Sequence, residues 1–218
     1  MAEAMVERKL WRAAIMQKLT PCFRESAASR MEALKGMAAD GIILHLGLYL
    51  WADSVFLYYE ALRPGVEPDF LFPEATGFLA LWPGEREPRP WIRLIDIFHF
   101  NEPASVDHWR RKRPVGWQIG QMGRLKPETI PHYLFYHYAL QEEQAFPGDK
   151  YEIIGISENL LFAYREKPEE FESPLYPPRL EAKVVPSNWD SVDIPSCFIP
   201  WPDLPGVCLR PMDPVLTL

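Results

Sequence analysis

The sequence has little of what a covalently linked or metal-held scaffold needs. Its 218 residues include three cysteines, at positions 22, 197 and 208, an odd number with no regular spacing. This set argues against a disulfide framework and a paired-cysteine zinc site. The chain also has no HExxH or GxSxG sequence, and no glycine-rich phosphate loop where a strand meets a helix. These absences argue against the zinc-protease, serine-hydrolase and nucleotide-binding classes.

The chain also lacks an excess of positive charge and a long apolar run. Its net charge is -7 and its pI is near 5.3, so electrostatics give no reason to bind nucleic acid or an anionic membrane. The longest apolar run, residues 41–52, is too short to cross a bilayer. Residues 1–9 are charged and lack the apolar core of a secretion signal. We therefore expect a cytoplasmic protein with neither nucleic acid nor membrane as a partner.

What the chain does have is a large apolar fraction, 48%, with eight tryptophans, enough for a sizeable core. The most regular stretch is residues 116–166. Alternating and helical patterns there predict a strand over residues 117–125, a helix over 128–145, and a strand pair over 151–156 and 160–164. Proline 131 fits this helix because it falls in the first turn.

The same β-α-β-β pattern occurs about one hundred residues earlier. Strands are predicted over residues 10–19, 42–50 and 55–62, a helix over 22–39, and a closing strand over 91–100. A shift of 106 positions aligns seven identical residues, all in predicted strands or at the strand-to-helix corner: Trp11 with Trp117, Met16 with Met122, Leu19 with Leu125, Pro21 with Pro127, Phe56 with Phe162, Tyr58 with Tyr164 and Glu60 with Glu166. We interpret this as an ancient duplication of one small unit.

The pattern predicts an α+β fold made of two ferredoxin-like β-α-β-β-α-β repeats, residues 1–106 and 107–218. An antiparallel sheet covered by helices on one side needs cover on its other side, and a second sheet of the same kind can supply it. We therefore expect the repeats to form an intramolecular dimeric α+β barrel, an internal pseudo-dimer. A homodimer of the whole chain is left open.

One face of the second-half helix is unusual. Tyr133 and His137 are four residues apart, so they lie on one side of the helix, where the first half has Ala27 and Met31. A phenol and an imidazole facing a sheet could hold a polar ligand and move its protons. The alternative is a half-buried histidine bonded to a backbone carbonyl, with tyrosine filling volume.

The second half resembles the L-rhamnose mutarotase family. The resemblance is carried by Leu125-Lys126-Pro127, by Tyr133-x-x-x-His137 and by Asn159-Leu160-Leu161-Phe162-Ala163-x-x-Glu166, and in the first half by Met16-Gln17, Pro21 and Asp53-Ser54-Val55-Phe56-x-x-x-Glu60. It implies an isomerase that interconverts the anomers of L-rhamnose or a related aldose without metal or organic cofactor. By this match His137 is the acid/base and Tyr133 its partner, with one such site per chain.

Further residues are candidates for contact with a sugar. We expect Tyr151, Trp189 and Glu143 to bind the substrate, although Glu143 also suits a solvated helix end and Trp189 could simply bury surface. Two other functions remain open for this architecture. One is a non-catalytic barrel that binds a ligand or a partner protein. The other is a cofactor-free monooxygenase or a heme-binding barrel.

Overall fold

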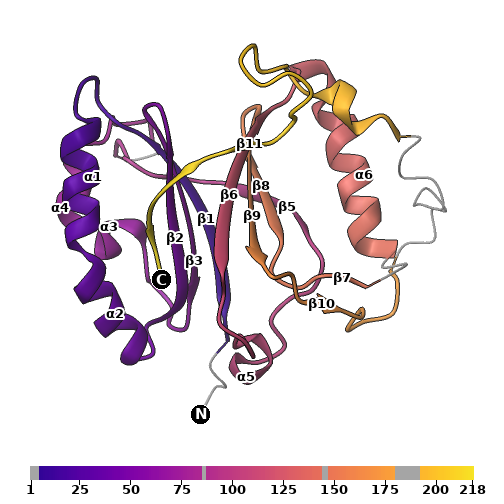
Figure 1. The fold of residues 1–218 in the computed structure, drawn as a ribbon, viewed down its shortest axis with the longest axis horizontal. Helices are drawn as coiled ribbons and strands as arrows, with labels where there is room; N and C mark the ends of the chain where they lie inside the picture. Colours follow the sequence, from indigo (N-terminus) through magenta and orange to yellow (C-terminus); the bar gives the residue numbers. More distant parts are fainter. Residues whose placement is uncertain (1–4, 85–86, 144–146, 180–191) are drawn as a thin grey trace. The chain divides into compact units, whose positions relative to one another are not determined.

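The structure is a computed structural model that describes residues 5–84, 87–143, 147–179 and 192–218. The chain has a mixed α+β fold with antiparallel sheets, which confirms the predicted fold class at that level (Figure 1). Its residues divide into two compact units. Unit 1 consists of residues 1–94, 103–114 and 212–218, and unit 2 consists of residues 95–102 and 115–211.

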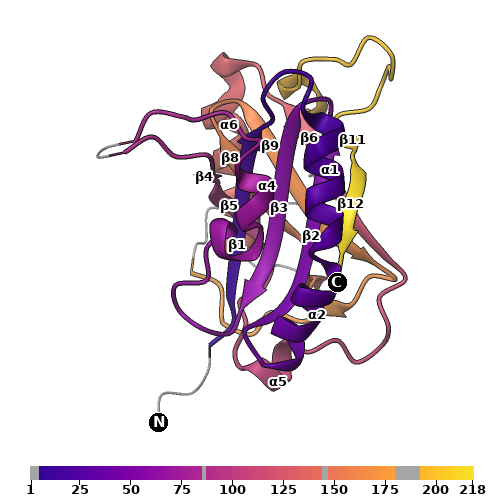
Figure 2. The same ribbon diagram turned by 90° about the vertical axis from the view of Figure 1, so that its left-hand side faces the viewer.

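Unit 1 is a five-stranded sheet with helices on one face. Its strands are β1 (Glu7–Ala14), β2 (Ile43–Trp51), β3 (Ser54–Ala61), β4 (Ile92–Arg93) and β12 (Asp213–Thr217). Its helices are α1 (Thr20–Ser29), α2 (Met31–Ala39), α3 (Pro68–Leu71), α4 (Pro73–Thr76) and α5 (Val106–Trp109). Figure 2 shows α1, α2 and α4 in front of the sheet. Strand alternation turns Leu57 and Tyr59 toward these helices, where both side chains are fully buried in the core.

The sequence predicts one continuous helix over residues 22–39, and this prediction is wrong. The segment divides into α1 and α2 at Arg30. The amide of Arg30 donates to the carbonyl of Ala27, three residues back, which is a tighter bond than an α-helix makes. The Arg30 side chain also donates to the carbonyl of Leu71, so a tertiary contact holds the chain at the break.

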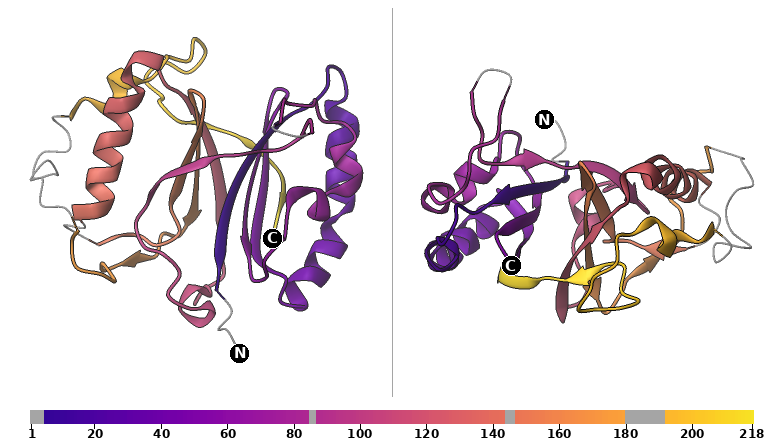
Figure 3. Two further views of the ribbon diagram at one scale, coloured as in Figure 1. Left: turned by 180° about the vertical axis from the view of Figure 1, so that it is seen from behind. Right: turned by 90° about the horizontal axis from the view of Figure 1, so that it is seen from above.

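Unit 2 also contains a five-stranded sheet, with one long helix beside it (Figure 3, left). Its strands are β5 (Ile95–His99), β6 (Trp117–Arg124), β8 (Ile153–Ser157), β9 (Leu160–Lys167) and β11 (Arg210–Pro211), and a two-stranded ribbon is made by β7 (Gly148–Asp149) and β10 (Phe171–Glu172). Its helical segments are η1 (Pro127–Thr129), α6 (Ile130–Glu143) and η3 (Ile194–Cys197). No helix in the described ranges is long and apolar enough to cross a bilayer.

The two sheets have corresponding strand orders. Unit 1 reads β12-β2-β3-β1-β4, and unit 2, taken from its other edge, reads β5-β8-β9-β6-β11. In each order the first strand is supplied by the opposite half of the sequence: β12 of unit 1 lies near the C-terminus, and β5 of unit 2 lies within residues 1–106. The predicted strand over residues 91–100 is therefore wrong as a single element, because β4 pairs with β1 while β5 pairs with β8. The boundary between residues 106 and 107, which was drawn for the repeat, stays a prediction.

On the face of the unit 1 sheet opposite α1 and α2, β3 carries a buried carboxylate. Glu60 is fully buried and accepts hydrogen bonds from Tyr58 Oη at 2.6 Å, Trp109 Nε1 at 2.9 Å and both terminal nitrogens of Arg111. Burial by itself raises the pKa of Glu60, but the charge and hydrogen bonds of Arg111 outweigh burial, and the pKa is lowered. Glu60 therefore remains ionised and ties α5 and the following loop to the sheet.

Unit 2 repeats part of this arrangement. In β9, Tyr164 Oη donates to Glu166 at 2.7 Å, and both side chains are buried. The shift of 106 positions aligned Tyr58 with Tyr164 and Glu60 with Glu166. The aligned residues thus make the same hydrogen bond in both sheets.

Removing Arg111 should destabilise the fold, because the buried Glu60 carboxylate then lacks its positively charged partner. We expect Arg111→Met to lower the free energy of unfolding in urea by roughly 3 kcal/mol, because it leaves an uncompensated charge in the interior. Adding Glu60→Gln to this variant should recover part of the loss. Arg110→Met is the control: its ion pair with Asp107 is exposed, so the change should stay within about 0.5 kcal/mol. Equal stability of the Arg111 and Arg110 variants would contradict this account of Glu60.

Candidate functional site

Helix α6 is positioned by the corner that precedes it. The amide of Lys126 donates to the carbonyl of Cys197 at 2.8 Å, and Thr129 Oγ1 lies 3.0 Å from the same carbonyl. Proline 127 then begins the short η1 turn, which continues directly into α6. The register of α6 places Tyr133 and His137 on the buried side, while Phe135 and Tyr138 are about half exposed on the other.

The phenol and the imidazole are in direct contact, as their spacing predicts. Their rings stack with centroids 3.9 Å apart and planes inclined by 25°. The Phe98 ring of β5 meets the His137 ring edge-on at 5.7 Å, and the Phe198 ring meets Tyr133 in the same way at 5.6 Å. His137 Nδ1 lies 2.9 Å from the backbone carbonyl of Tyr133. Because a carbonyl oxygen only accepts, Nδ1 carries the proton in the neutral ring and Nε2 is the basic nitrogen.

Burial determines the protonation of both groups. His137 is 6% exposed, and desolvation lowers its pKa to about 4, against a smaller opposing effect of the Tyr133 carbonyl. Desolvation raises the pKa of Tyr133, and the Glu152 carboxylate raises it further. At neutral pH the site therefore holds a neutral imidazole, which can accept a proton, and a protonated phenol, which can donate a hydrogen bond.

These two residues line a cavity of about 300 Å³ between α6 and the sheet of unit 2. Most of its wall is apolar: Phe98, Leu140, Ile154, Ile194, Phe198 and Leu209. The polar groups on it are Tyr133, His137, Glu152 and the thiol of Cys208. This volume lies at the lower end of the range for small-molecule sites. A flat aromatic molecule of one or two rings matches both the size and the lining.

A second cavity of about 240 Å³ adjoins the first. Both are lined by Phe98, Leu140 and Glu152. The second cavity extends toward the β7/β10 ribbon and adds charged side chains, namely Asp149, Arg165 and Glu169. Together the two cavities offer an apolar chamber with a polar extension.

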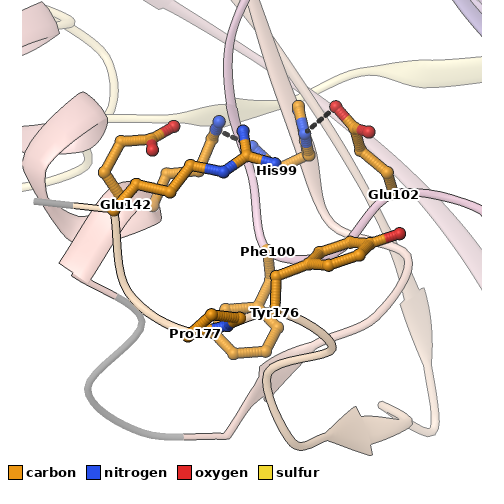
Figure 4. A pocket seen from close by; sticks show the side chains of 8 residues that line it. His99, Phe100, Glu102, Glu142, Tyr176 and Pro177 are labelled. Carbon is orange, nitrogen blue, oxygen red and sulfur yellow. Dashed lines mark hydrogen bonds and ion pairs between the residues drawn. The ribbon is translucent and has the colours of Figure 1, made fainter.

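A third cavity lies at the other side of the α6 C-terminus and is much smaller, about 30 Å³, enough for about one water molecule. Figure 4 shows Glu102 directed at the His99 ring, whose Nε2 lies 3.5 Å from the Glu102 carboxylate. His99 Nδ1 also lies 2.8 Å from Asp96. His99 is thus held by two carboxylates, as expected for a structural histidine.

Two of the remaining candidates from the sequence, Tyr151 and Glu143, do not line the cavities beside α6. Tyr151 is buried, with Lys150 Nζ 5.5 Å from its ring centre, and it is not among the described residues that line either cavity next to α6. Glu143 is half-buried in the last turn of α6 and is also not among them. Trp189 lies outside the described residues. In the described ranges, no three histidine, cysteine, aspartate or glutamate side chains are placed to hold a metal.

Several residues of the site were not predicted from the sequence. Phe98 lies in a predicted strand, but its role depends on that strand joining unit 2. Ile194 and Phe198 come from a segment with no periodic pattern, and long-range hydrogen bonds, such as those of Lys126 and Thr129 to the Cys197 carbonyl, hold that segment at the corner before α6. Glu152 precedes a strand, and no local signal marked it.

The buried imidazole should make folding stability depend on pH. Its folded pKa, about 4, lies below its ordinary value near 6.5, so the unfolded state binds the proton first. The contribution to stability is complete above pH 6.5 and is lost as the pH falls toward 4. We expect the wild type to lose roughly 3 kcal/mol more than His137→Phe over this interval, measured by urea unfolding at a series of pH values.

The matched control is His132→Phe, which changes an exposed histidine of the same helix and should keep the wild-type pH dependence. Parallel pH profiles for the wild type and His137→Phe would contradict the buried, neutral state of His137.

No protein-family model and no curated protein sequence matches the chain. Among solved structures, one match is a crystal structure described as a "putative monooxygenase" from Lactobacillus acidophilus NCFM, with 9% identity and a TM-score of 0.43, covering 98% of this chain and 95% of that one. Another, described in the same words, is from Fusobacterium nucleatum subsp. nucleatum ATCC 25586, with 8% identity and a TM-score of 0.43, covering 100% and 95%. Similarities this distant carry no argument about activity, which must come from the site itself.

Proposed function

We propose that the chain is a duplicated, ferredoxin-like α+β barrel protein that binds a small hydroxylated aromatic molecule in the cavity beside α6. The corresponding strand orders and the matching Tyr58–Glu60 and Tyr164–Glu166 hydrogen bonds support the duplication. The observation that carries the ligand assignment is the mostly apolar cavity faced by one buried, neutral imidazole. The ligand hydroxyl donates to Nε2 of His137, and the ring packs against Phe98 and Phe198.

Proton transfer from this hydroxyl to His137 is the chemical step that the site can perform. An imidazole whose pKa is near 4 in the empty cavity is a weak base. The aryloxide formed beside it stabilises the imidazolium, because an opposite charge at contact favours the charged form. An electron-rich aryloxide or enolate can react with O2 directly. The substrate then loses two hydrogen atoms, gains one oxygen atom, and the other oxygen leaves as water, which is monooxygenation without a cofactor.

Anomer interconversion of L-rhamnose or a related aldose by His137 and Tyr133 is the other proposal. Mutarotation also requires a proton acceptor and a proton donor, and this pair provides both. A sugar in addition needs polar partners for several hydroxyls. The described wall of the main cavity offers few besides this pair, so its lining favours the aromatic ligand.

The hydroxyl should be recognised through His137. We expect 2-naphthol to bind the wild type about ten-fold more tightly than naphthalene, the gain expected of one buried hydrogen bond. His137→Phe should bind both compounds with similar affinity, and His132→Phe should keep the preference. Fluorescence titration measures these affinities. Equal binding of the two compounds by the wild type would contradict the proposed ligand class.

Activity assays distinguish monooxygenation and mutarotation from ligand binding without reaction. With a panel of hydroxylated monocyclic and bicyclic aromatics, we expect oxygen uptake that depends on protein and is lost in His137→Phe. Saturation-transfer NMR of L-rhamnose anomers tests the other reaction. Accelerated anomer exchange without oxygen uptake would favour the mutarotase proposal. Ligand binding with neither activity would leave a binding protein and would contradict the proposed monooxygenation.

A further inference from the structure

Leu140 lies where the two cavities beside α6 meet. It lines both of them, and the other residues that they share are Phe98 and Glu152. Phe98 belongs to β5 and Glu152 directly precedes β8, so both come from the sheet side of the cavities. Among the described residues that line the second cavity, Leu140 is the one that comes from α6. The junction of the cavities therefore lies between one helix side chain and two side chains from the sheet side.

The register of α6 explains the position of Leu140. Leu140 follows His137 by three residues and Tyr133 by seven, so the three side chains lie on one side of the helix. Each residue adds about 1.5 Å along the axis, which places Leu140 about 4.5 Å beyond His137, toward the end of α6 near the β7/β10 ribbon (Figure 1). A ligand that lies against Tyr133 and His137 therefore meets Leu140 at its far end.

The core of unit 2 holds the Leu140 side chain in place. Leu140 is half-buried and packs against the buried cluster that includes Tyr133 and Ile154. Side chains packed in this way stay in one rotamer, so Leu140 excludes ligand atoms from the space that it fills. Phe98 is the other apolar side chain at the junction, but its ring contacts the His137 ring edge-on at 5.7 Å. A change at Phe98 would disturb the imidazole, so Leu140 is the position that separates ligand length from the chemistry at His137.

We propose that Leu140 determines the length of the ligand. Its side chain confines the ligand to the main cavity, of about 300 Å³, and keeps longer molecules out of the second cavity, of about 240 Å³. This inference rests on the proposed function, because it requires a ligand in the main cavity. It narrows the substrate class to aromatic molecules of one or two rings whose substituents are short.

The test compares 2-methylnaphthalene with 2-butylnaphthalene, which differ only in the length of an apolar tail and carry no hydroxyl. Leu140→Ala removes most of the side chain and should bind the butyl compound about ten-fold more tightly than the wild type does. This is the gain expected when about two further methylene groups are buried. The methyl compound should bind the two proteins with affinities that agree within about two-fold. Fluorescence titration measures all four affinities.

Leu134→Ala is the matched control. Leu134 is also a half-buried leucine of α6, but it lines an open groove beside β5 and is not among the described residues that line either cavity. This variant should keep the wild-type ratio of the two affinities. Leu140→Val shortens the side chain less than Leu140→Ala and should change the ratio in the same direction by a smaller factor. Leu140→Phe enlarges the side chain and should bind the butyl compound more weakly than the wild type does.

The outcomes separate this role of Leu140 from the proposed function. An unchanged ratio in Leu140→Ala, or an equal gain for both compounds, overturns the role in ligand length. So does wild-type binding of the butyl compound roughly fifty-fold more tightly than of the methyl compound, which is the full gain from three buried methylene groups. Failure of the wild type and of Leu140→Ala to bind either compound overturns both proposals. Equal binding of 2-naphthol and naphthalene, with the length effect intact, overturns hydroxyl recognition at His137 and leaves the role of Leu140 supported.

Discussion

The candidate site depends on the burial of one imidazole between a helix and a sheet. His137 is the polar group that α6 turns toward the interior one helical turn after Tyr133, and its Nδ1 is bonded to the Tyr133 carbonyl of its own helix. That local bond satisfies one ring nitrogen and fixes the tautomer, while the apolar wall keeps the ring neutral. The same ring borders a cavity.

Buried polar groups have different surroundings on the two faces of the sheets. On the face of the unit 1 sheet opposite α1 and α2, the buried carboxylate of Glu60 accepts hydrogen bonds from Tyr58, Trp109 and Arg111, which makes it structural. On the helix face of unit 2, the imidazole of His137 is bonded to the Tyr133 carbonyl and borders a cavity. Groups that are fully hydrogen-bonded by the protein hold the fold together, and polar groups that border a cavity are the ones that remain able to act on a ligand.

The sequence predicts helices and strands correctly where a regular pattern extends over a whole element. Alternation predicts the strand β6, and i, i+4 spacing predicts the contact of Tyr133 with His137. The β-rich run predicted over residues 160–164 is the first part of β9. Tertiary contacts decided the rest. The bond from Arg30 to Leu71 accompanies a break in a helix that looked continuous.

Local patterns could not predict which strands of one half of the sequence pair within the sheet of the other half. Residues 91–100 look like one strand, yet the pairing divides them between two sheets, and Phe98 reaches the site only through that division.

The most direct test of the central claim is an NMR titration of the His137 ring nitrogens, with and without 2-naphthol. The account predicts a neutral ring protonated on Nδ1 with a pKa near 4 in the free protein, and a higher pKa when the aryloxide lies beside it. A ring that titrates near 6.5 in the free protein, or one that does not respond to the ligand, would contradict it.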